Sequence, residues 1–302
     1  MSPEPDHQPP ALKDADYLSY TWADLSWSPW IPFTADKDEF RQIQKEPGIY
    51  RIRPAGQDFL MYIGETRKPL YQRLQNLRME LFGADQMPWA DPHAESAALW
   101  AWRDAEAFEY ECSVTPLDVT TPGRRAMESF LLYRYRQERG ESPLCNFGRF
   151  HPRYRRSTIR KESLRGGKLA ADQKDNPAGS PGCPPLVPAG TPGEPGWMGI
   201  SWSSRTALVP ETIATAPAGP GLYLLIDAVS QEICSIGQSV RCRNRLLDQA
   251  GKTWEGREMG FSCHAADEMV LPHHLKEMEN DLVGNYFEQY RKAPEYQFRS
   301  SE

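Results

Sequence analysis

The sequence predicts a mixed α/β (α+β) fold in which a small antiparallel sheet flanked by helices is present twice in tandem. Three observations predict it: two strand-like runs joined by a turn, helical periodicity in the segments that follow, and a weaker second copy of the arrangement. We therefore expect a first domain over residues 1–150 with an N-terminal extension, a linker over 151–196 and a second domain over 197–302.

The first strand pair is predicted over residues 48–53 and 59–63, which are rich in β-branched and aromatic side chains. A turn around Gly56 separates the two runs, so we expect an antiparallel hairpin. Because side chains alternate across a strand, Tyr50 and Tyr62 are expected on the same side of the sheet.

Two helices are predicted after the hairpin. The first carries Arg73 beside an apolar stripe with helical spacing, made of Leu70, Leu74, Leu77 and Leu81. The second is expected over residues 124–139, because Gly140 marks an end and Asn146 would then lie in the exit loop.

An internal repeat relates the two ends of the chain. Four motifs recur in order, with the third beginning twelve residues after the second ends in both copies, and Asn146 and Gln297 follow the glutamates of the fourth at an interval of eighteen residues. The matched pairs are Ser26-Trp27-Ser28 with Ser201-Trp202-Ser203, Gly48-Ile49-Tyr50 with Gly221-Leu222-Tyr223, Tyr62-Ile63-Gly64 with Ser235-Ile236-Gly237, and Met127-Glu128 with Met278-Glu279. Such agreement predicts a tandem duplication.

The segment between the copies has two parts. Residues 149–168 hold eight Lys or Arg and one Glu on a chain whose net charge is −6, whereas residues 176–196 are rich in Pro, Gly and Ala, as in a linker. A local excess of cations suits DNA backbone binding, although a charge run can equally be a solvated linker. The candidate DNA-binding residues are Arg153, Arg155, Arg156, Arg160 and Lys161.

Composition excludes several classes. The six cysteines form no Cys-x-x-Cys pair, so free and mostly buried thiols are expected rather than a disulfide framework or a structural zinc. The first residues lack the pattern of a secretory leader, and no run of eighteen apolar residues occurs. We expect a soluble, cytoplasmic protein that makes no use of a membrane.

Glu128 is the most informative single residue. At helical spacing it shares the expected buried face with Leu131, Leu132 and Tyr135, where a carboxylate is costly unless it is paired or bound to metal. A carboxylate completed by water and phosphate oxygens suits Mg²⁺ (or Mn²⁺), and the planar guanidinium of Arg73 suits phosphate oxygens. An Arg–Glu ion pair and an ordinary surface glutamate remain alternatives for Glu128.

The paired motifs Gly48-Ile49-Tyr50 and Tyr62-Ile63-Gly64 resemble those of GIY-YIG nucleases, over about residues 48–147. The resemblance implies that Tyr50 acts as base toward water, with Tyr62 hydrogen-bonded to it. It further implies that Arg73 holds the scissile phosphate, that Glu128 binds the metal ion, and that Asn146 orients the glutamate helix. A base role requires that the pKa of the tyrosine falls from about 10.

Two departures from the family pattern matter. Several members place a histidine or tyrosine four residues after the arginine, where this chain has Leu77, and His93 is a candidate substitute from a loop. The second copy keeps Tyr223, Arg245 and Glu279 but has Ser235 in place of the second tyrosine and Gln297 in place of the asparagine. We expect that second site to be degenerate.

The function expected from the sequence is therefore a metal-dependent endonuclease that hydrolyses DNA. A noncatalytic DNA-binding protein made of two such modules is the main alternative, and an interaction module without a nucleic-acid partner is a third. The sequence does not distinguish DNA from RNA, and it does not indicate an oligomeric state.

Overall fold

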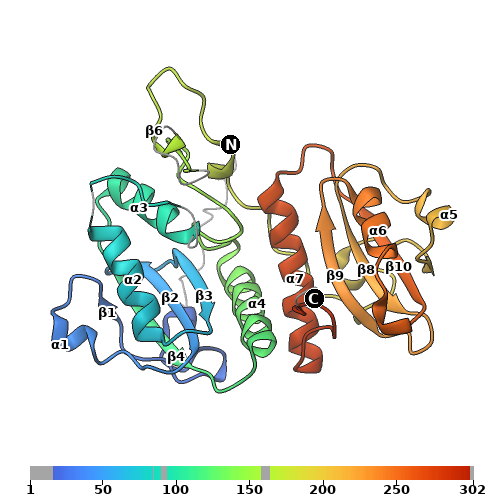
Figure 1. The fold of residues 1–302 in the computed structure, drawn as a ribbon, viewed down its shortest axis with the longest axis horizontal. Coiled ribbons are helices and arrows are strands. Elements are labelled where there is room, and N and C mark those ends of the chain that lie inside the picture. The colour runs from blue at the N-terminus through green and yellow to red at the C-terminus, as the bar shows by residue number, and fades with distance from the viewer. Residues whose placement is uncertain (1–15, 84, 90–93, 158–163, 300–302) are drawn as a thin grey trace, which may run out of the picture.

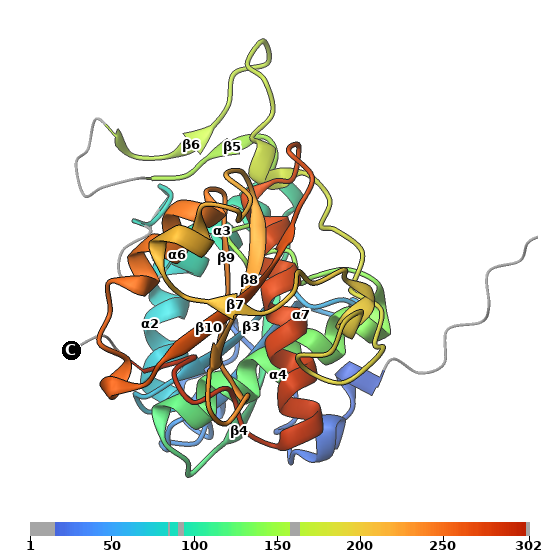
Figure 2. The ribbon, with the colours of Figure 1, turned by 90° about the vertical axis from the view of Figure 1, so that its right-hand side faces the viewer.

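A computed structural model describes residues 16–83, 85–89, 94–157 and 164–299. In these ranges the chain forms two four-stranded antiparallel sheets, each flanked by helices (Figure 1). Helices α4 (Thr121–Arg139) and α7 (Pro272–Tyr290) lie side by side between the sheets, as the view from the right also shows (Figure 2). The predicted class, mixed α/β with antiparallel sheets flanked by helices, is confirmed.

The first sheet has the strand order β1-β4-β2-β3. Its strands are β1 (Ile31–Pro32), β2 (Gly48–Pro54), β3 (Tyr62–Thr66) and β4 (Tyr110–Pro116). The other helices of this half are α1 (Lys37–Phe40), α2 (Leu70–Phe82) and α3 (Ala94–Glu106).

The second sheet repeats that order as β7-β10-β8-β9. Its strands are β7 (Thr206–Ala207), β8 (Gly221–Asp227), β9 (Ile233–Ser239) and β10 (Met259–Ala265), and its other helices are α5 (Pro210–Ile213) and α6 (Cys242–Ala250). Between the halves, β5 (Tyr154–Arg155) and β6 (Gly167–Lys168) form a short ribbon. The identical order agrees with the sequence repeat, while the descent of both halves from one GIY-YIG-like unit stays a prediction.

The predicted hairpin exists, but its second strand begins later than expected, at Tyr62. The residues before it are held by side chains from outside the sheet. The Leu60 N–H donates to the Tyr135 hydroxyl at 3.0 Å, and the Asp58 carbonyl accepts from the Tyr17 hydroxyl at 2.6 Å. Met61 still donates to the Ile52 carbonyl of β2 at 2.8 Å, whereas Leu60 and Asp58 contact α4 and the N-terminal segment instead.

Tryptophans that the sequence repeat matches make the same contacts in both halves. The indole N–H of Trp27 donates to the Trp22 carbonyl at 3.1 Å, and that of Trp202 donates to the Trp197 carbonyl at 3.2 Å. The two ring pairs are stacked with centroids 6.0 Å and 6.2 Å apart. Trp22 and Trp27 belong to one buried apolar cluster with Ile49 and Ile63 of the first sheet, and the Trp197–Trp202 pair belongs to another.

Side-chain packing requires the glycine that ends each strand motif. A Cβ on Gly64 would lie 2.9 Å from the Tyr50 hydroxyl oxygen, and a Cβ on Gly237 would lie 2.3 Å from that of Tyr223. Gly64 pairs with Tyr50 across β2 and β3, and Gly237 pairs with Tyr223 across β8 and β9. In both sheets the tyrosine ring therefore lies directly over a residue that must lack a side chain.

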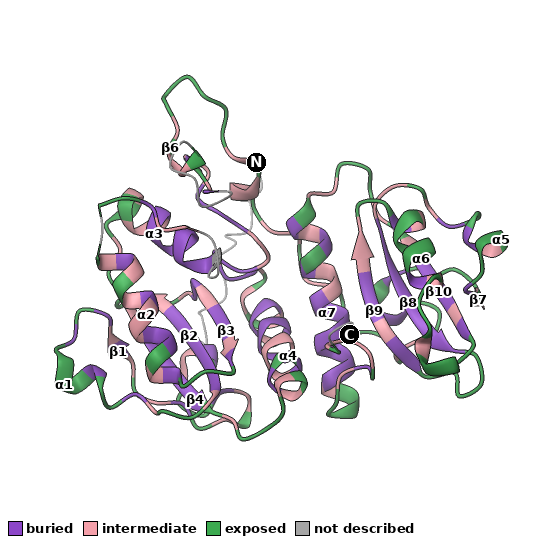
Figure 3. Ribbon diagram, in the orientation of Figure 1, coloured by how far each residue is buried: buried purple, intermediate pink, exposed green. Residues whose placement is uncertain are grey.

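The two halves pack through the surfaces of α4 and α7 that face each other, and both are largely buried (Figure 3). Close approach depends on Gly284, where a Cβ would lie 2.2 Å from the Cβ of Tyr133. Phe130 and Phe287 add a ring contact with centroids 5.3 Å apart.

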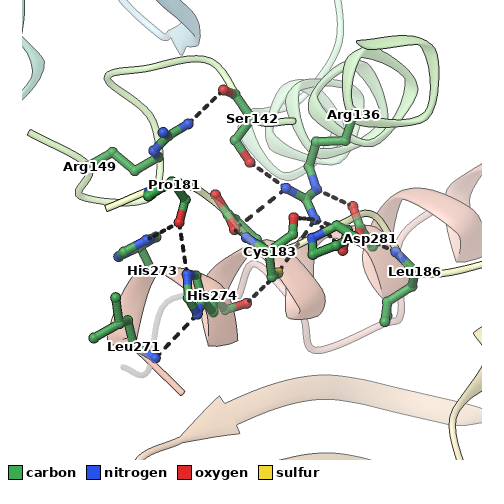
Figure 4. A network of polar contacts seen from close by, with 12 residues as sticks. Arg136, Ser142, Arg149, Pro181, Cys183, Leu186, Leu271, His273, His274 and Asp281 are labelled. Atoms are coloured by element: carbon green, nitrogen blue, oxygen red, sulfur yellow. Dashed lines mark hydrogen bonds and ion pairs between the residues drawn. The ribbon is translucent and has the colours of Figure 1, made fainter. Parts of the chain in front are cut away.

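A buried polar network closes one end of this interface (Figure 4). Arg136 of α4 donates to Asp281 of α7 from Nε at 2.8 Å, and both side chains are fully buried. The chain between the halves joins the network, because the Cys183 N–H donates to Glu277 and the Leu186 N–H donates to Asp281. The Pro/Gly-rich segment is therefore fixed here by specific hydrogen bonds to α7.

The cysteines are as expected from the composition. All six cysteines are free, and all except Cys183 are buried, as predicted. Within the described part of the chain, none of the helices has the length and apolarity needed to span a bilayer.

Candidate active site

Tyr50 occupies the middle of β2, and its ring is 1% exposed. Its hydroxyl accepts a hydrogen bond from Nε of Arg73 at 3.0 Å. Arg73 lies in the first turn of α2, where the leucine stripe faces the sheet and brings the guanidinium to the tyrosine. The structure thus joins two of the predicted site residues directly.

A third residue completes this contact and was missed by sequence reasoning. Glu95 of α3 forms a buried ion pair with Arg73 and accepts a hydrogen bond from the Tyr50 hydroxyl at 3.4 Å. Its side chain is 7% exposed. The run Ala-Glu-Ser-Ala-Ala-Leu-Trp that opens α3 has strong helix formers, and this was the available signal for a helix.

Glu128 lies on α4 at the edge of the sheet and is half-buried. Burial, followed by the negative charge of Glu65, raises its pKa to about 8. The neighbouring cations Arg124 and Arg125 lie 3.5 Å and 3.8 Å from the carboxylate of Glu65. Glu65 therefore takes the paired position, and Glu128 faces open space.

That space is a pocket of about 320 Å³. Its lining includes Tyr62, Glu95, Glu128 and Asn146, together with Arg156 from the cation-rich residues 149–168, here called the basic strip. Two carboxylates, a phenol and a guanidinium therefore face one small volume, and the Tyr50–Arg73 contact lies directly behind it.

Asn146 fixes the backbone of β3. Its Oδ1 accepts from the Ile63 N–H at 3.0 Å and its Nδ2 donates to the Ile63 carbonyl at 2.8 Å. Gln297 makes the same pair of bonds with Ile236, at 2.8 Å and 3.0 Å. The side-chain amide, which both residues share, is thus sufficient for this contact.

The tyrosines differ from the expectation for a base. Burial raises the pKa of Tyr50 despite the opposing charge of Arg73, and burial raises the pKa of Tyr62 well above its usual value. The rings of Tyr50 and Tyr62 are 5.9 Å apart, but among the described residues the Tyr50 hydroxyl bonds to Arg73 and Glu95. The hydrogen bond implied between the two tyrosines is therefore replaced by a ring contact.

The second half arranges its matched residues differently. Tyr223 is buried, and its hydroxyl accepts a hydrogen bond from Gln249 Nε2 at 3.4 Å. Arg245 is exposed rather than buried, and Ser235 provides no ring. Burial raises the pKa of Glu279 to about 7, although Lys276 and Arg245 oppose the shift.

The predicted DNA-binding residues lie in different surroundings. Arg153 forms an ion pair with Asp175 at 2.7 Å and donates to two backbone carbonyls, which gives it a structural role. Arg155 is exposed, while Arg156 is half-buried and lines the pocket beside Glu128. Arg160 and Lys161 lie outside the described residues, as does His93.

The donor set fits a hard divalent cation. Carboxylate oxygens of Glu128 and Glu95 face the same pocket, and such oxygens with retained water are what Mg²⁺ prefers. Burial and the charge of Glu65, which raise the pKa of Glu128, disfavour its ionised form, and a bound cation would stabilise that form. No cluster of three or more His, Cys, Asp or Glu ligands occurs among the described residues.

Comparisons of the chain with family models, with curated proteins and with solved structures find no match. The assignment of a function accordingly rests on the geometry above and on the motifs of the sequence.

Proposed function

We propose that the first half is a metal-dependent endonuclease that hydrolyses DNA phosphodiester bonds. The observation that carries the proposal is that Tyr50, Arg73 and Glu95 contact one another from three different elements, and that Glu95 lines one pocket together with Glu128 from a fourth. Clusters of desolvated ionisable groups in a cleft are typical of catalytic sites.

Each side chain has a role that its surroundings support. Arg73 would hold a phosphate oxygen with its planar donors while its Nε stays on Tyr50. Glu128 would bind Mg²⁺ or Mn²⁺, with Glu95 as a second carboxylate that lines the same pocket. When bound, the ion supplies positive charge to the phosphate and to the leaving oxygen.

Because burial raises the pKa of Tyr50, its phenol stays protonated at neutral pH. A proton relay through the phenol is therefore favoured over a permanently ionised tyrosine base. The phenol oxygen would accept a proton from the attacking water while its own proton passes to Glu95 Oε1, 3.4 Å away. The new bond joins the water oxygen to phosphorus, and the bond to the leaving oxygen breaks. Tyr50 thus remains neutral before and after the transfer, which agrees with its burial.

The test is the nicking of supercoiled plasmid by the purified full chain with Mg²⁺ or Mn²⁺. We expect nicking that EDTA abolishes and that Tyr50→Phe lowers by roughly a hundredfold or more, as for loss of a proton-transfer group. Tyr223→Phe is the matched control because the same hydroxyl is removed from the second half, and it should retain activity.

A second candidate function has one observation in its favour. The guanidinium of Arg73 is already engaged by Glu95, as expected of a structural ion pair in a noncatalytic DNA-binding module. Salt-sensitive DNA binding without nicking in either metal would establish that function in place of the nuclease.

A further inference from the structure

A cleft of about 1500 Å³ is lined by both halves of the molecule. The first half contributes the end of β3, the start of α2 and the start of α4, through residues such as Arg67, Arg73 and Arg125. The second half contributes the end of α6 and the segment after α7, through residues such as Lys252 and Arg299. The cleft is distinct from the smaller pocket that holds Glu128.

The lining is strongly basic on an acidic chain. Six cations line the cleft against the two carboxylates of Glu65 and Glu255, although the whole chain carries a net charge of −6. The cations are Arg67, Lys68, Arg73, Arg125, Lys252 and Arg299. Concentrating one sign of charge in a concave surface attracts a polyanion.

Several of these cations remain available to a ligand. Arg67, Lys68 and Lys252 are exposed, and within the described residues no carboxylate pairs with them. Arg299 is held by Glu255 at 2.7 Å, and Arg125 lies 3.8 Å from Glu65. The available charges therefore come from both walls.

An aromatic surface accompanies the charges. Trp254 and Tyr296 both line the cleft, with their rings edge to face at 5.3 Å, and Nζ of Lys252 lies 5.7 Å from the Trp254 ring. The half-buried Trp254 is fixed by a hydrogen bond from its indole N–H to the Gln249 carbonyl at 2.9 Å. A positioned ring among lysines and arginines is the arrangement that binds single strands, since bases stack while cations track phosphates.

We propose that this cleft binds a single-stranded segment of the polynucleotide substrate, with its phosphates against Arg67, Lys68 and Lys252 and one base on Trp254. The inference rests on the proposed function and adds to it the strand type and the surface. A strand in the cleft would pass Arg73 of the first site and Ser235, Gln249 and Gln297 of the second, which line the same volume.

The experiment measures the binding of labelled probes of about 16 nucleotides by fluorescence anisotropy, in EDTA so that no cleavage can occur. The probes are oligo(dT), oligo(U) and a duplex DNA. They compare single-stranded DNA with single-stranded RNA, and single strands with a double strand. Arg67→Gln with Lys252→Gln removes one exposed cation from each wall. Lys45→Gln with Lys292→Gln is the matched control, with one exposed cation from each half outside the cleft.

We expect single strands to bind more tightly than the duplex. The cleft pair should weaken binding about tenfold and lower the salt slope by roughly 1.4, since each lost single-strand phosphate contact removes about 0.7. Trp254→Leu should weaken binding about tenfold through lost stacking. The control pair should bind as the wild type does.

Three results would overturn the inference: tighter binding of the duplex, an equal loss in the control pair, or a larger loss in Arg155→Gln with Lys168→Gln from the basic strip. The nicking assay on the same proteins separates this failure from failure of the proposed function. Nicking that persists in the cleft pair would place substrate binding elsewhere and leave the nuclease intact. Binding without nicking would retain the cleft and remove the catalytic proposal.

Discussion

In the first half the tyrosine at the centre of the sheet contacts an arginine and a glutamate, whereas in the second half its counterpart contacts a glutamine. Tyr50 accepts from the buried Arg73, which Glu95 holds in place. Tyr223 accepts from Gln249 while Arg245 remains exposed. The backbone frame is shared, because each tyrosine lies over a motif glycine and each sheet has the same strand order. The strands of the sheet are thus the same in both halves, although the polar side chains that contact the tyrosine differ.

Helix α3 accounts for most of this difference. It supplies Glu95 to the first half, between α2 and β4. The corresponding stretch of the second half, between α6 and β10, holds only the short turn Trp254–Gly256. The second site opens toward the large cleft through Ser235 and Gln249, whereas the first site reaches that cleft through Arg73 and lines a smaller pocket of its own with Glu95 and Glu128.

The largest expected effect concerns the carboxylate that only the first half has. Glu95→Ala removes the buried charge facing Arg73, and breaking a buried ion pair costs about 3 kcal/mol or more of folding stability. Arg245→Ala, at an exposed position, should change stability by less than about 0.5 kcal/mol. Urea unfolding midpoints measure the stability of both variants. A loss of stability in Glu95→Ala no larger than that in Arg245→Ala would mean that the buried partner of Arg73 gives it no surroundings different from those of the exposed Arg245.

The amide contacts give the next effect and test the similarity of the halves. Asn146→Ala leaves the N–H and carbonyl of Ile63 without their partner and should cost about 2 kcal/mol. Gln297→Ala should destabilise by a smaller amount, because its side chain is half-buried whereas that of Asn146 is buried. Thermal unfolding of both variants is the measurement, and an unchanged midpoint for Gln297→Ala would show that only the first half depends on this contact.

A smaller effect is a dependence on pH. Because burial raises the pKa of Glu128 to about 8, the folded protein holds that proton where an unfolded glutamate has lost it. Stability should fall as pH rises from about 4.5 toward 8, whereas metal binding, which requires the carboxylate, should strengthen over the upper part of that range.

Nicking at low Mg²⁺ should accordingly rise roughly tenfold between pH 7 and pH 9, as the ionised fraction of Glu128 grows. The measurement is an initial rate at each pH, with saturating Mg²⁺ as the control condition in which the rise should shrink. A rate that falls over this interval would contradict the role of Glu128 as a metal ligand.

Local patterns in the sequence were enough to predict much of the fold. The leucine stripe of α2 and the end of α4 at Gly140 follow from spacing and capping, and both are observed. The strand order of the second sheet agrees with the repeat. The start of β3 was misplaced, because the hydroxyls of Tyr17 and Tyr135, distant in sequence, hold the residues before it.

The site was predictable only in part. Tyr50, Arg73, Glu128 and Asn146 follow from the motifs, and the structure brings them to one region. Glu95 lies in a segment that has no match in the second half, so the repeat could not indicate it. The large basic cleft depends on how α4 and α7 pack, and no pattern within one half could have indicated it.

The most direct test of the account compares Glu128→Gln with Glu279→Gln in the plasmid assay with Mg²⁺. Both substitutions remove a half-buried carboxylate of raised pKa from the same position of matched helices, so their effects on folding should be similar. We predict that Glu128→Gln abolishes nicking and that Glu279→Gln retains it. Loss of nicking in Glu279→Gln with retention in Glu128→Gln would contradict the assignment of catalysis to the first half.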